Sequence, residues 1–199
     1  EGKCLLNRIG LACAPAEEAA KILKLAYVTS SFAVNIAKTH DPNIIGDKAI
    51  EDVANSYKLL KDLGIYTVLN LSCPNTKEGK TFEEPESLDE LLNELEKIGK
   101  GRPLLIKLSP NLTKNRIREL VKVSHDRVDG YEAVNTLPSE HKEYGKGGKS
   151  GPFLLDHALP IIKTLREIID PNKVIIGCGG IFSGVDMYEM RLVGANAFL

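Results

Sequence analysis

The sequence has 199 residues, of which 43% are hydrophobic and 27% charged, and its 26 basic and 27 acidic side chains leave a net charge of -1. These proportions are those of a globular protein with enough length for one sizeable core, so a single domain is predicted over residues 1–199. Because the charges are spread along the chain, no basic stripe indicates binding to nucleic acid or to an acidic membrane surface. A small neutral or anionic metabolite is the ligand class that fits.

The sequence lacks the usual targeting and metal-binding patterns. No apolar run approaches the roughly 18 to 20 residues that cross a membrane, and the first residues lack the layout of a signal peptide, so a cytoplasmic protein is expected. The four cysteines, Cys4, Cys13, Cys73 and Cys178, form neither a CxxC pair nor a dense disulfide framework. Free thiols are therefore predicted. The histidines share no metal-ligand spacing, and no metal site is predicted.

Short apolar runs alternate along the chain with longer segments whose apolar residues repeat every three or four positions. In chain order, the predicted elements are a strand at 32–37, a helix at 47–64, a strand at 67–72, a helix at 88–98 capped by Ser87, a strand at 104–109, a helix that follows Thr113, a strand at 130–135, a helix at 156–169, a strand at 173–177, a helix at 184–192 and a strand from Ala197. This repetition predicts parallel strands with helical crossovers, in either a doubly wound sheet or a (β/α)8 barrel.

The C-terminal ends of the predicted strands favour the barrel. Polar residues or glycines occupy these ends in five successive strands, namely Asn35, Asn70, Lys107, Asn135 and the run containing Gly177, Gly179 and Gly180. A TIM barrel collects its active site from many strand ends, whereas a doubly wound sheet concentrates it at one switch point. Since only six strands are predicted and the last stops at Leu199, the chain is expected to be part of a barrel.

The segment 70–76, Asn-Leu-Ser-Cys-Pro-Asn-Thr, follows a strand and breaks at Pro74, so its polar groups lie where the chain leaves the sheet. One interpretation makes Cys73 a small buried hydrophobe and the asparagines turn formers. In the other, the amides of Asn70 and Asn75 read the edge of a planar heterocycle, and Cys73 is a base or nucleophile beside it. The two flanking asparagines favour the second interpretation.

Further along the chain, Lys107 and two glycine-rich segments indicate an anionic ligand. Lys107 points away from the face shared by the apolar residues of its strand, so it is either a solvated strand end or an inward cation with a partner such as a phosphate or a reduced flavin. Two predicted turns, at 147–151 and 177–180, with Ser183 and Gly184 just before a helix, are able to present backbone N–H groups to a phosphate. Simple tight turns are the alternative.

In order and spacing, these motifs resemble those of the dihydroorotate dehydrogenases, which are FMN-dependent TIM-barrel enzymes. The segments that carry the resemblance are 70–76, 106–110, 134–136, 147–151 and 175–184, together with 6–11, which resembles the family's short substrate-contacting segment. The resemblance covers essentially the whole chain. It implies an α/β fold, a partial (β/α)8 TIM barrel that lacks the first two strands and the end of the last.

The resemblance also implies the site and the reaction. The FMN contacts would be Asn35, Asn70, Lys107, Val134, Ser150, Gly151, Gly179, Gly180, Ser183 and Gly184. The substrate contacts would be Asn7, Gly10, Leu11, Asn70, Asn75, Asn135 and Thr136. The implied reaction is oxidation of dihydroorotate to orotate in de novo pyrimidine (UMP) synthesis. Cys73 would remove a ring proton while hydride passes to the flavin, and Lys107 would offset the developing negative charge.

The electron acceptor, the oligomeric state and the function itself each leave alternatives open. The electron acceptor is a quinone, fumarate or a partner subunit: a cysteine base resembles the soluble enzymes, whereas 74–76 and 148–151 resemble the quinone-linked form, which would lie peripherally at a membrane. A homodimer is compatible with both the soluble and the quinone-linked form.

Two different functions also stay open. One is a pyrimidine-reducing domain like that of dihydropyrimidine dehydrogenase, and the other is a non-catalytic barrel fragment.

Overall fold

The computed structural model describes residues 3–26, 30–72 and 81–199. The chain divides into two compact units. Unit 1 comprises Glu1–Ile9, Lys107–His125 and Gly130–Leu199, and unit 2 comprises Gly10–Ile106 and Asp126–Asp129. The single domain over residues 1–199 stays a prediction.

Unit 2 is a run of parallel strands with helices between them. Its elements are α1 (Ala16–Leu25), β2 (Val34–Ala37), α2 (Asp47–Leu60), β3 (Thr67–Asn70), α3 (Pro85–Ile98) and the beginning of β4 (Leu104–Leu108). β2 pairs with β3 in parallel, with Ala37 opposite Asn70. The N–H of Thr67 then donates to the carbonyl of Pro103, just before β4, at 2.8 Å. Helix α2 packs against both α1 and α3, and its buried face includes Val53 and Tyr57.

Unit 1 continues the same alternation. Its elements are the end of β4, α4 (Lys114–Ser124), β5 (Gly130–Ala133), α5 (Leu154–Ile168), β8 (Val174–Gly177), α6 (Gly184–Leu192) and β9 (Ala197–Phe198). The strand order is β4–β5–β8–β9, and β8 lies parallel to both β5 and β9. Beyond the strands, the N–H of Asn135 donates to the carbonyl of Leu108 at 2.8 Å. Helix α5 packs against α4 and α6, which completes a helical layer.

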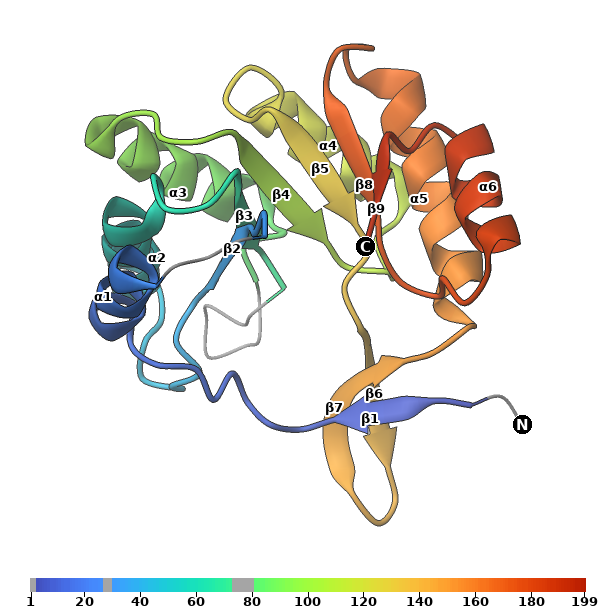
Figure 1. The fold of residues 1–199 in the computed structure, drawn as a ribbon, viewed down its shortest axis with the longest axis horizontal. Helices are drawn as coiled ribbons and strands as arrows, with labels where there is room; N and C mark the ends of the chain where they lie inside the picture. Colours follow the sequence, from blue (N-terminus) through green and yellow to red (C-terminus); the bar gives the residue numbers. More distant parts are fainter. Residues whose placement is uncertain (1–2, 27–29, 73–80) are drawn as a thin grey trace. The chain divides into compact units, whose positions relative to one another are not determined.

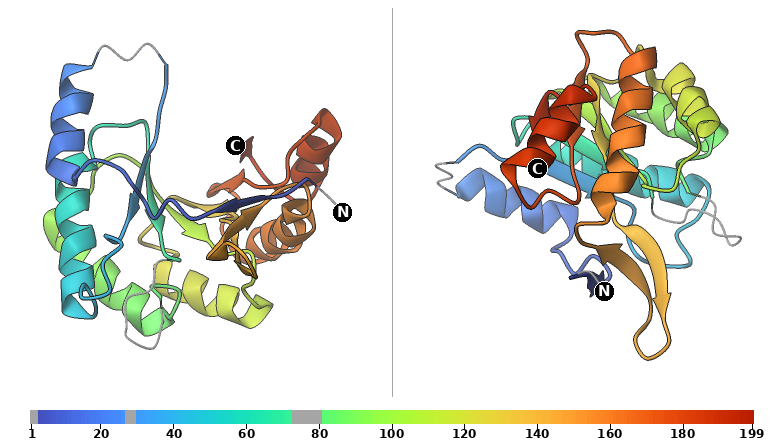
Figure 2. Two further views of the ribbon diagram at one scale, coloured as in Figure 1. Left: turned by 90° about the horizontal axis from the view of Figure 1, so that it is seen from below. Right: turned by 90° about the vertical axis from the view of Figure 1, so that its right-hand side faces the viewer.

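A small antiparallel sheet forms the rest of unit 1. It consists of β1 (Leu5–Asn7), β7 (Gly145–Ser150) and β6 (Leu137–His141), in that order. The β6–β7 hairpin projects away from β5, β8 and β9 (Figures 1 and 2). The prediction of a turn at 147–151 was wrong, because residues 147–150 are part of β7. The glycines permit close pairing: a Cβ on Gly147 would lie 2.5 Å from the carbonyl oxygen of Asn7.

The six predicted strands are present, each shorter than or equal to its predicted run, and β9 begins at Ala197 as predicted. The prediction that Thr113 is the N-cap of α4 is confirmed, because its Oγ1 accepts the N–H of Arg116 at 3.2 Å. Ser87 is not the N-cap of α3. This helix begins at Pro85, three residues before its predicted start at residue 88, because proline suits the first helical position. Helix α2 ends at Leu60, before the predicted Gly64.

Within the residues that the structure describes, none of the helices is both long and apolar enough to cross a membrane.

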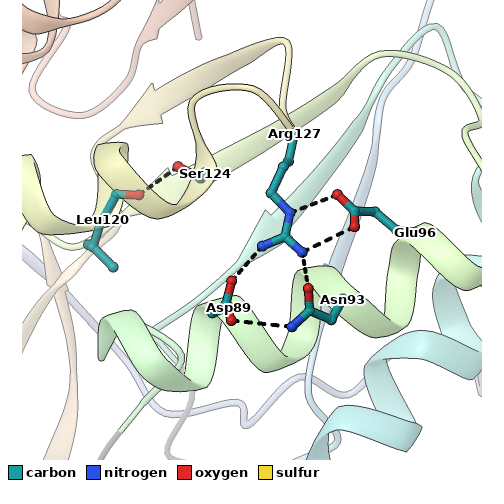
Figure 3. Close-up of polar contacts among 6 residues, drawn as sticks. All are labelled: Asp89, Asn93, Glu96, Leu120, Ser124 and Arg127. Carbon is teal, nitrogen blue, oxygen red and sulfur yellow. Dashed lines mark hydrogen bonds and ion pairs between the residues drawn. The ribbon is translucent and has the colours of Figure 1, made fainter.

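In unit 2, Arg127 links the segment after α4 to helix α3 (Figure 3). Its guanidinium donates to Asp89 at 2.7 Å, to Glu96 at 2.7 and 3.2 Å, and to Asn93. The Arg127 side chain is 15% exposed, whereas Asp89 and Glu96 are more than half exposed. The hydrogen bond from Arg127 lowers the pKa of Glu96, and the nearby positive charge adds to this effect. A lowered carboxyl pKa stabilises the fold above the ordinary pKa, and this contribution is lost as pH falls through the folded-state pKa.

We expect Arg127→Gln to lower the free energy of unfolding by about 1 kcal/mol near neutral pH, with a smaller difference in acid, because the network is multidentate but partly exposed to solvent. Urea denaturation of the full-length protein, at neutral and at acidic pH, measures this loss of stability. The control is Lys97→Gln, which removes an exposed cation that pairs with Glu94 within α3. Its effect should stay below about 0.5 kcal/mol. Equal losses for the two variants would refute a special role for Arg127.

Candidate functional site

A cavity of about 590 Å³ opens in unit 1 between the end of β7 and the residues after β8. Its lining residues are Lys3, Cys4, Leu5, Ser150, Gly151, Leu154, Gly179, Gly180, Ile181, Phe182 and Leu199. Four of the predicted cofactor-binding residues, Ser150, Gly151, Gly179 and Gly180, therefore border one cavity. They come from two glycine segments that lie far apart in the sequence.

Bare backbone forms part of the cavity wall, and the conformation there requires glycine. Gly179 and Gly180 have φ angles of +95° and +78°. A Cβ on Gly180 would lie 2.2 Å from the backbone nitrogen of Leu155, and one on Gly151 would lie 2.7 Å from the carbonyl oxygen of Lys3. The lining also includes Ser150 and Lys3, residue types that carry a hydroxyl and a cation, and this combination fits a phosphate. The lining residues therefore suit the phosphate end of a nucleotide-like cofactor.

Ser183 and Gly184 lie at the start of α6, directly after the lining residue Phe182. Asp186 Oδ2 accepts the N–H groups of Phe182 and Ser183 at 2.8 and 2.6 Å, and Ser183 Oγ accepts the N–H of Asp186 at 3.4 Å. The hydrogen bonds from the Phe182 backbone and the Ser183 side chain lower the pKa of Asp186. Ser183 is thus a helix cap here, and its role toward a cofactor stays a prediction.

Lys107 on β4 forms an ion pair with Glu132 on β5, and their side chains are only 14% and 3% exposed. Lys107 Nζ also lies 3.9 Å from Sγ of Cys178, which follows β8. Lys107 is therefore not a solvated strand end. Burial raises the pKa of the Cys178 thiol, whereas the charge of Lys107 lowers it and that of Glu132 raises it.

The alternation of side chains along the strands explains this cluster. Next to Glu132, the hydroxyl of Tyr131 lies 2.8 Å from Oγ of Ser124 on α4, so Tyr131 faces the helices. Next to Cys178, a Cβ on Gly177 would lie 2.5 Å from Sδ of Met190 on α6. Since neighbouring residues in a strand point to opposite faces, Glu132 faces away from the helices. Cys178 directly follows β8, and its contact with Lys107 places its sulfur beside the same ion pair.

Three other predicted residues of unit 1 lie close to these groups or to the small sheet. The N–H of Val134 donates to the carbonyl of Cys178 at 2.7 Å. Asn7 pairs with Gly148 across β1 and β7, and a Cβ on Gly148 would lie 2.3 Å from Oγ1 of Thr136. The structure therefore brings two predicted substrate residues, Asn7 and Thr136, to the same glycine.

Asn135, the residue before Thr136, uses its Oδ1 to accept the N–H of Thr136 at 2.9 Å.

The remaining predicted site residues belong to unit 2. Asn35 lies within β2 and Asn70 ends the neighbouring strand β3. The amide oxygen of Asn70 accepts the Ser72 hydroxyl at 2.7 Å. Gly10 and Leu11 are exposed, and their φ angles are +74° and +57°.

Cys73 and Asn75 lie outside the described residues.

Sequence reasoning missed Glu132 and the part played by Cys178. The signal that could have found Glu132 is a single carboxylate inside a strand that is otherwise expected to be buried, because such a charge requires a partner. For Cys178 the sequence predicted a free thiol within a glycine-rich turn, but not its contact with Lys107.

Two glycines near the cavity offer a matched pair of substitutions. Gly180→Ala should lower the free energy of unfolding by about 2 kcal/mol or more, because it combines a left-handed backbone with a clash against the backbone of Leu155. Gly184→Ala should be neutral or stabilising by up to about 1 kcal/mol, since nothing lies within 4 Å of its Cβ position and its φ is ordinary. Chemical denaturation compares the two variants. Equal stability would show that the backbone at Gly180 is not constrained as described.

Comparison with known proteins identifies a family and relatives to which this chain is similar. The family model described as "Dihydroorotate dehydrogenase" matches residues 1–198. The dihydroorotate dehydrogenase (quinone) of Myxococcus xanthus is 32% identical over 208 residues, which cover 98% of this chain and 56% of that protein. Its counterpart in Thermus thermophilus is 33% identical over 205 residues, covering 98% of this chain and 58% of that one.

Among solved structures, the ligand-free dihydroorotate dehydrogenase of Eimeria tenella matches with a TM-score of 0.83 at 23% identity, covering 98% of this chain and 63% of that chain. Its ferulenol complex gives a TM-score of 0.80 at 22% identity, with 98% and 61% covered. The chain thus spans less than two thirds of the proteins it matches. The structural likeness confirms the fold as part of a TIM barrel, and because the family model covers residues 1–198, the chain belongs to the dihydroorotate dehydrogenase family.

Proposed function

We propose that the full-length protein carrying this chain oxidises dihydroorotate to orotate, the redox step of pyrimidine synthesis, and binds FMN to do so. The observation that carries the proposal is the glycine-walled cavity of unit 1, in a chain that the family model matches almost from end to end. The reaction removes one proton and one hydride from adjacent ring carbons. It therefore needs a base, a hydride acceptor and a binding surface for a planar anionic ring.

The phosphate of FMN would lie against the backbone of Gly151, Gly179 and Gly180, with Ser150 as a hydroxyl donor. When bound, FMN supplies the hydride acceptor. Ser183 and Gly184, at the start of α6, would add to the phosphate site. The proposed contacts to the rest of the cofactor are Asn35, Asn70, Lys107 and Val134. Lys107 would favour the negative charge that develops as hydride is taken up.

The substrate would be oriented by side-chain amides, a hydroxyl and backbone groups, which donate hydrogen bonds to its ring and carboxylate or accept hydrogen bonds from its ring. We assign this role to Asn7, Gly10, Leu11, Asn70, Asn75, Asn135 and Thr136. The position of Asn7 and Thr136 on either side of Gly148 supports a shared role for these two residues.

Cys73 is the proposed base. Its thiolate would accept the ring proton as the hydride leaves the adjacent carbon, which converts the single bond between these carbons into a double bond. An ordinary thiol has a pKa of about 8.5 and is mostly protonated at neutral pH, so neighbouring groups must favour the thiolate.

The proposed electron acceptor is a quinone. The relatives from Myxococcus xanthus and Thermus thermophilus carry the word quinone in their names. A quinone acceptor implies a protein that works peripherally at a membrane. The family match and these relatives favour this function over a dihydropyrimidine dehydrogenase-like domain or a non-catalytic fragment.

We expect Cys73→Ala to retain FMN and orotate but to lose on the order of 100-fold or more in the rate of flavin reduction by dihydroorotate, the usual contribution of a positioned base. In the parent, this rate should rise with pH through the ionisation of the thiol. Stopped-flow absorbance of the flavin bands measures it. Cys73→Ser should fall in between.

Cys13→Ala is the control, because Cys13 is an exposed thiol of the same unit. It should leave the rate and its pH profile unchanged. If Cys73→Ala reduces its flavin at the parent rate with the same profile, Cys73 is a packing residue and Ser72 is the nearest candidate base. A protein that cannot be loaded with FMN would refute the proposed function itself.

The choice of acceptor is tested with the parent enzyme alone. After reduction by dihydroorotate, a short-chain quinone should reoxidise the flavin at least about tenfold faster than fumarate does, because a site that binds quinones would discriminate against the small dianion fumarate. Rapid mixing of the reduced enzyme with each acceptor gives the two rates. Faster reoxidation by fumarate would assign the protein to the soluble type.

A further inference from the structure

The ion pair of Lys107 and Glu132 is unusual because the carboxylate is the more deeply buried partner. The Glu132 side chain is 3% exposed and that of Lys107 is 14% exposed. The two residues lie on the adjacent strands β4 and β5, and Cys178 after β8 completes the cluster with its sulfur 3.9 Å from Nζ of Lys107. Gly179, the next residue, already lines the cavity.

A carboxylate in this position changes what Lys107 offers to a ligand. An isolated lysine would present a full positive charge, and its buried ammonium would be costly without a partner. With Glu132 in contact, the cluster presents a charge pair, whose field weakens faster with distance than that of a single charge. The stabilisation of a nearby negative charge is therefore the difference between an attractive contribution from Lys107 and a repulsive one from Glu132.

We propose that Glu132 is a positioning residue that holds Lys107 in place, and that the pair, rather than the lysine alone, sets how strongly the site stabilises the negative charge that develops on the flavin. This inference rests on the proposed function, which places Lys107 beside FMN. Its consequence is directional. Glu132 keeps the flavin easier to reoxidise than a lone lysine would, and electrons pass on to the acceptor more readily.

Cys178 provides a reporter of the same charges that needs no flavin. Burial raises the pKa of its thiol, Lys107 lowers this pKa and Glu132 raises it. Removing the charge of Glu132 should therefore increase the thiolate fraction of Cys178 at a fixed pH and speed its alkylation. Iodoacetamide labelling followed by peptide mass spectrometry resolves each cysteine, and the exposed Cys13, which does not line the cavity, serves as the internal standard for the reagent.

The experiment compares Glu132→Gln and Glu132→Asp with Glu140→Gln in the full-length protein. Glu140 lies exposed on β6 of the same unit, so its variant controls for the loss of one negative charge. Glu132→Gln should shift the flavin equilibrium toward the reduced form by about tenfold, roughly 30 mV for two electrons, and should speed Cys178 alkylation about threefold or more. Glu140→Gln should change neither measurement.

Glu132→Asp withdraws the carboxylate by one methylene and should give smaller changes in the same direction, which keeps the test decisive if Glu132→Gln does not fold. A flavin-loaded variant of Glu132 with the parent potential and the parent alkylation rate would overturn the inference and leave the proposed function standing. A parent protein that binds no FMN would overturn the proposed function, and the inference with it.

Discussion

Parallel pairing of β5 with β8 is the constraint on which the site in unit 1 depends. It places Ala133 opposite Gly177 and so brings the ends of the two strands level. One face of these strands is committed to the helices, as the contact of Tyr131 with Ser124 shows. Glu132, the residue that follows Tyr131 in β5, must then face the other way. Because the two strand ends are level, Glu132 and Cys178, the residue directly after β8, both reach Lys107.

The same strand ends lead directly into the cavity. The chain leaves β8 through two glycines with positive φ, and a side chain at Gly180 would collide with the start of α5. Gly151 follows the end of β7 so close to Lys3 that a Cβ would lie 2.7 Å from the carbonyl oxygen of Lys3. The glycines thus serve two purposes at once. They let distant chain segments pack against one another, and they leave backbone rather than side chains along the cavity, where the proposed phosphate would bind.

How much of this the sequence predicts depends on how local the determining interactions are. Strands such as β4 and the cap at Thr113 follow from neighbouring residues, and both were predicted correctly. Strand β7 could not be predicted in this way, because its glycine-rich sequence has low strand propensity and is held by pairing with β1 and β6, far away in the chain. Pro85 moved the start of α3 because a rigid first residue outweighs a polar cap two positions later.

The candidate site shows the same division. The glycines and Lys107 were predicted as site residues because their residue types indicate anion binding in any context, and their roles stay predictions. Glu132 was missed because a lone carboxylate in a strand acquires meaning only when its partner on the next strand is known. The role of Cys73 rests on sequence alone, since it lies outside the described residues.

Stability is a poor explanation for the Lys107–Glu132 pair. Replacing a buried ion pair by apolar residues of similar volume is often neutral or stabilising, because the attraction between the charges barely offsets the loss of their hydration. Removing only one partner, by contrast, leaves an uncompensated charge and costs about 3–5 kcal/mol. A fold that buries the ammonium of Lys107 on β4 is therefore obliged to bury an anion with it. On this argument the two residues form one functional unit, and the effect of any substitution at Lys107 includes the consequence of leaving Glu132 without its counterion.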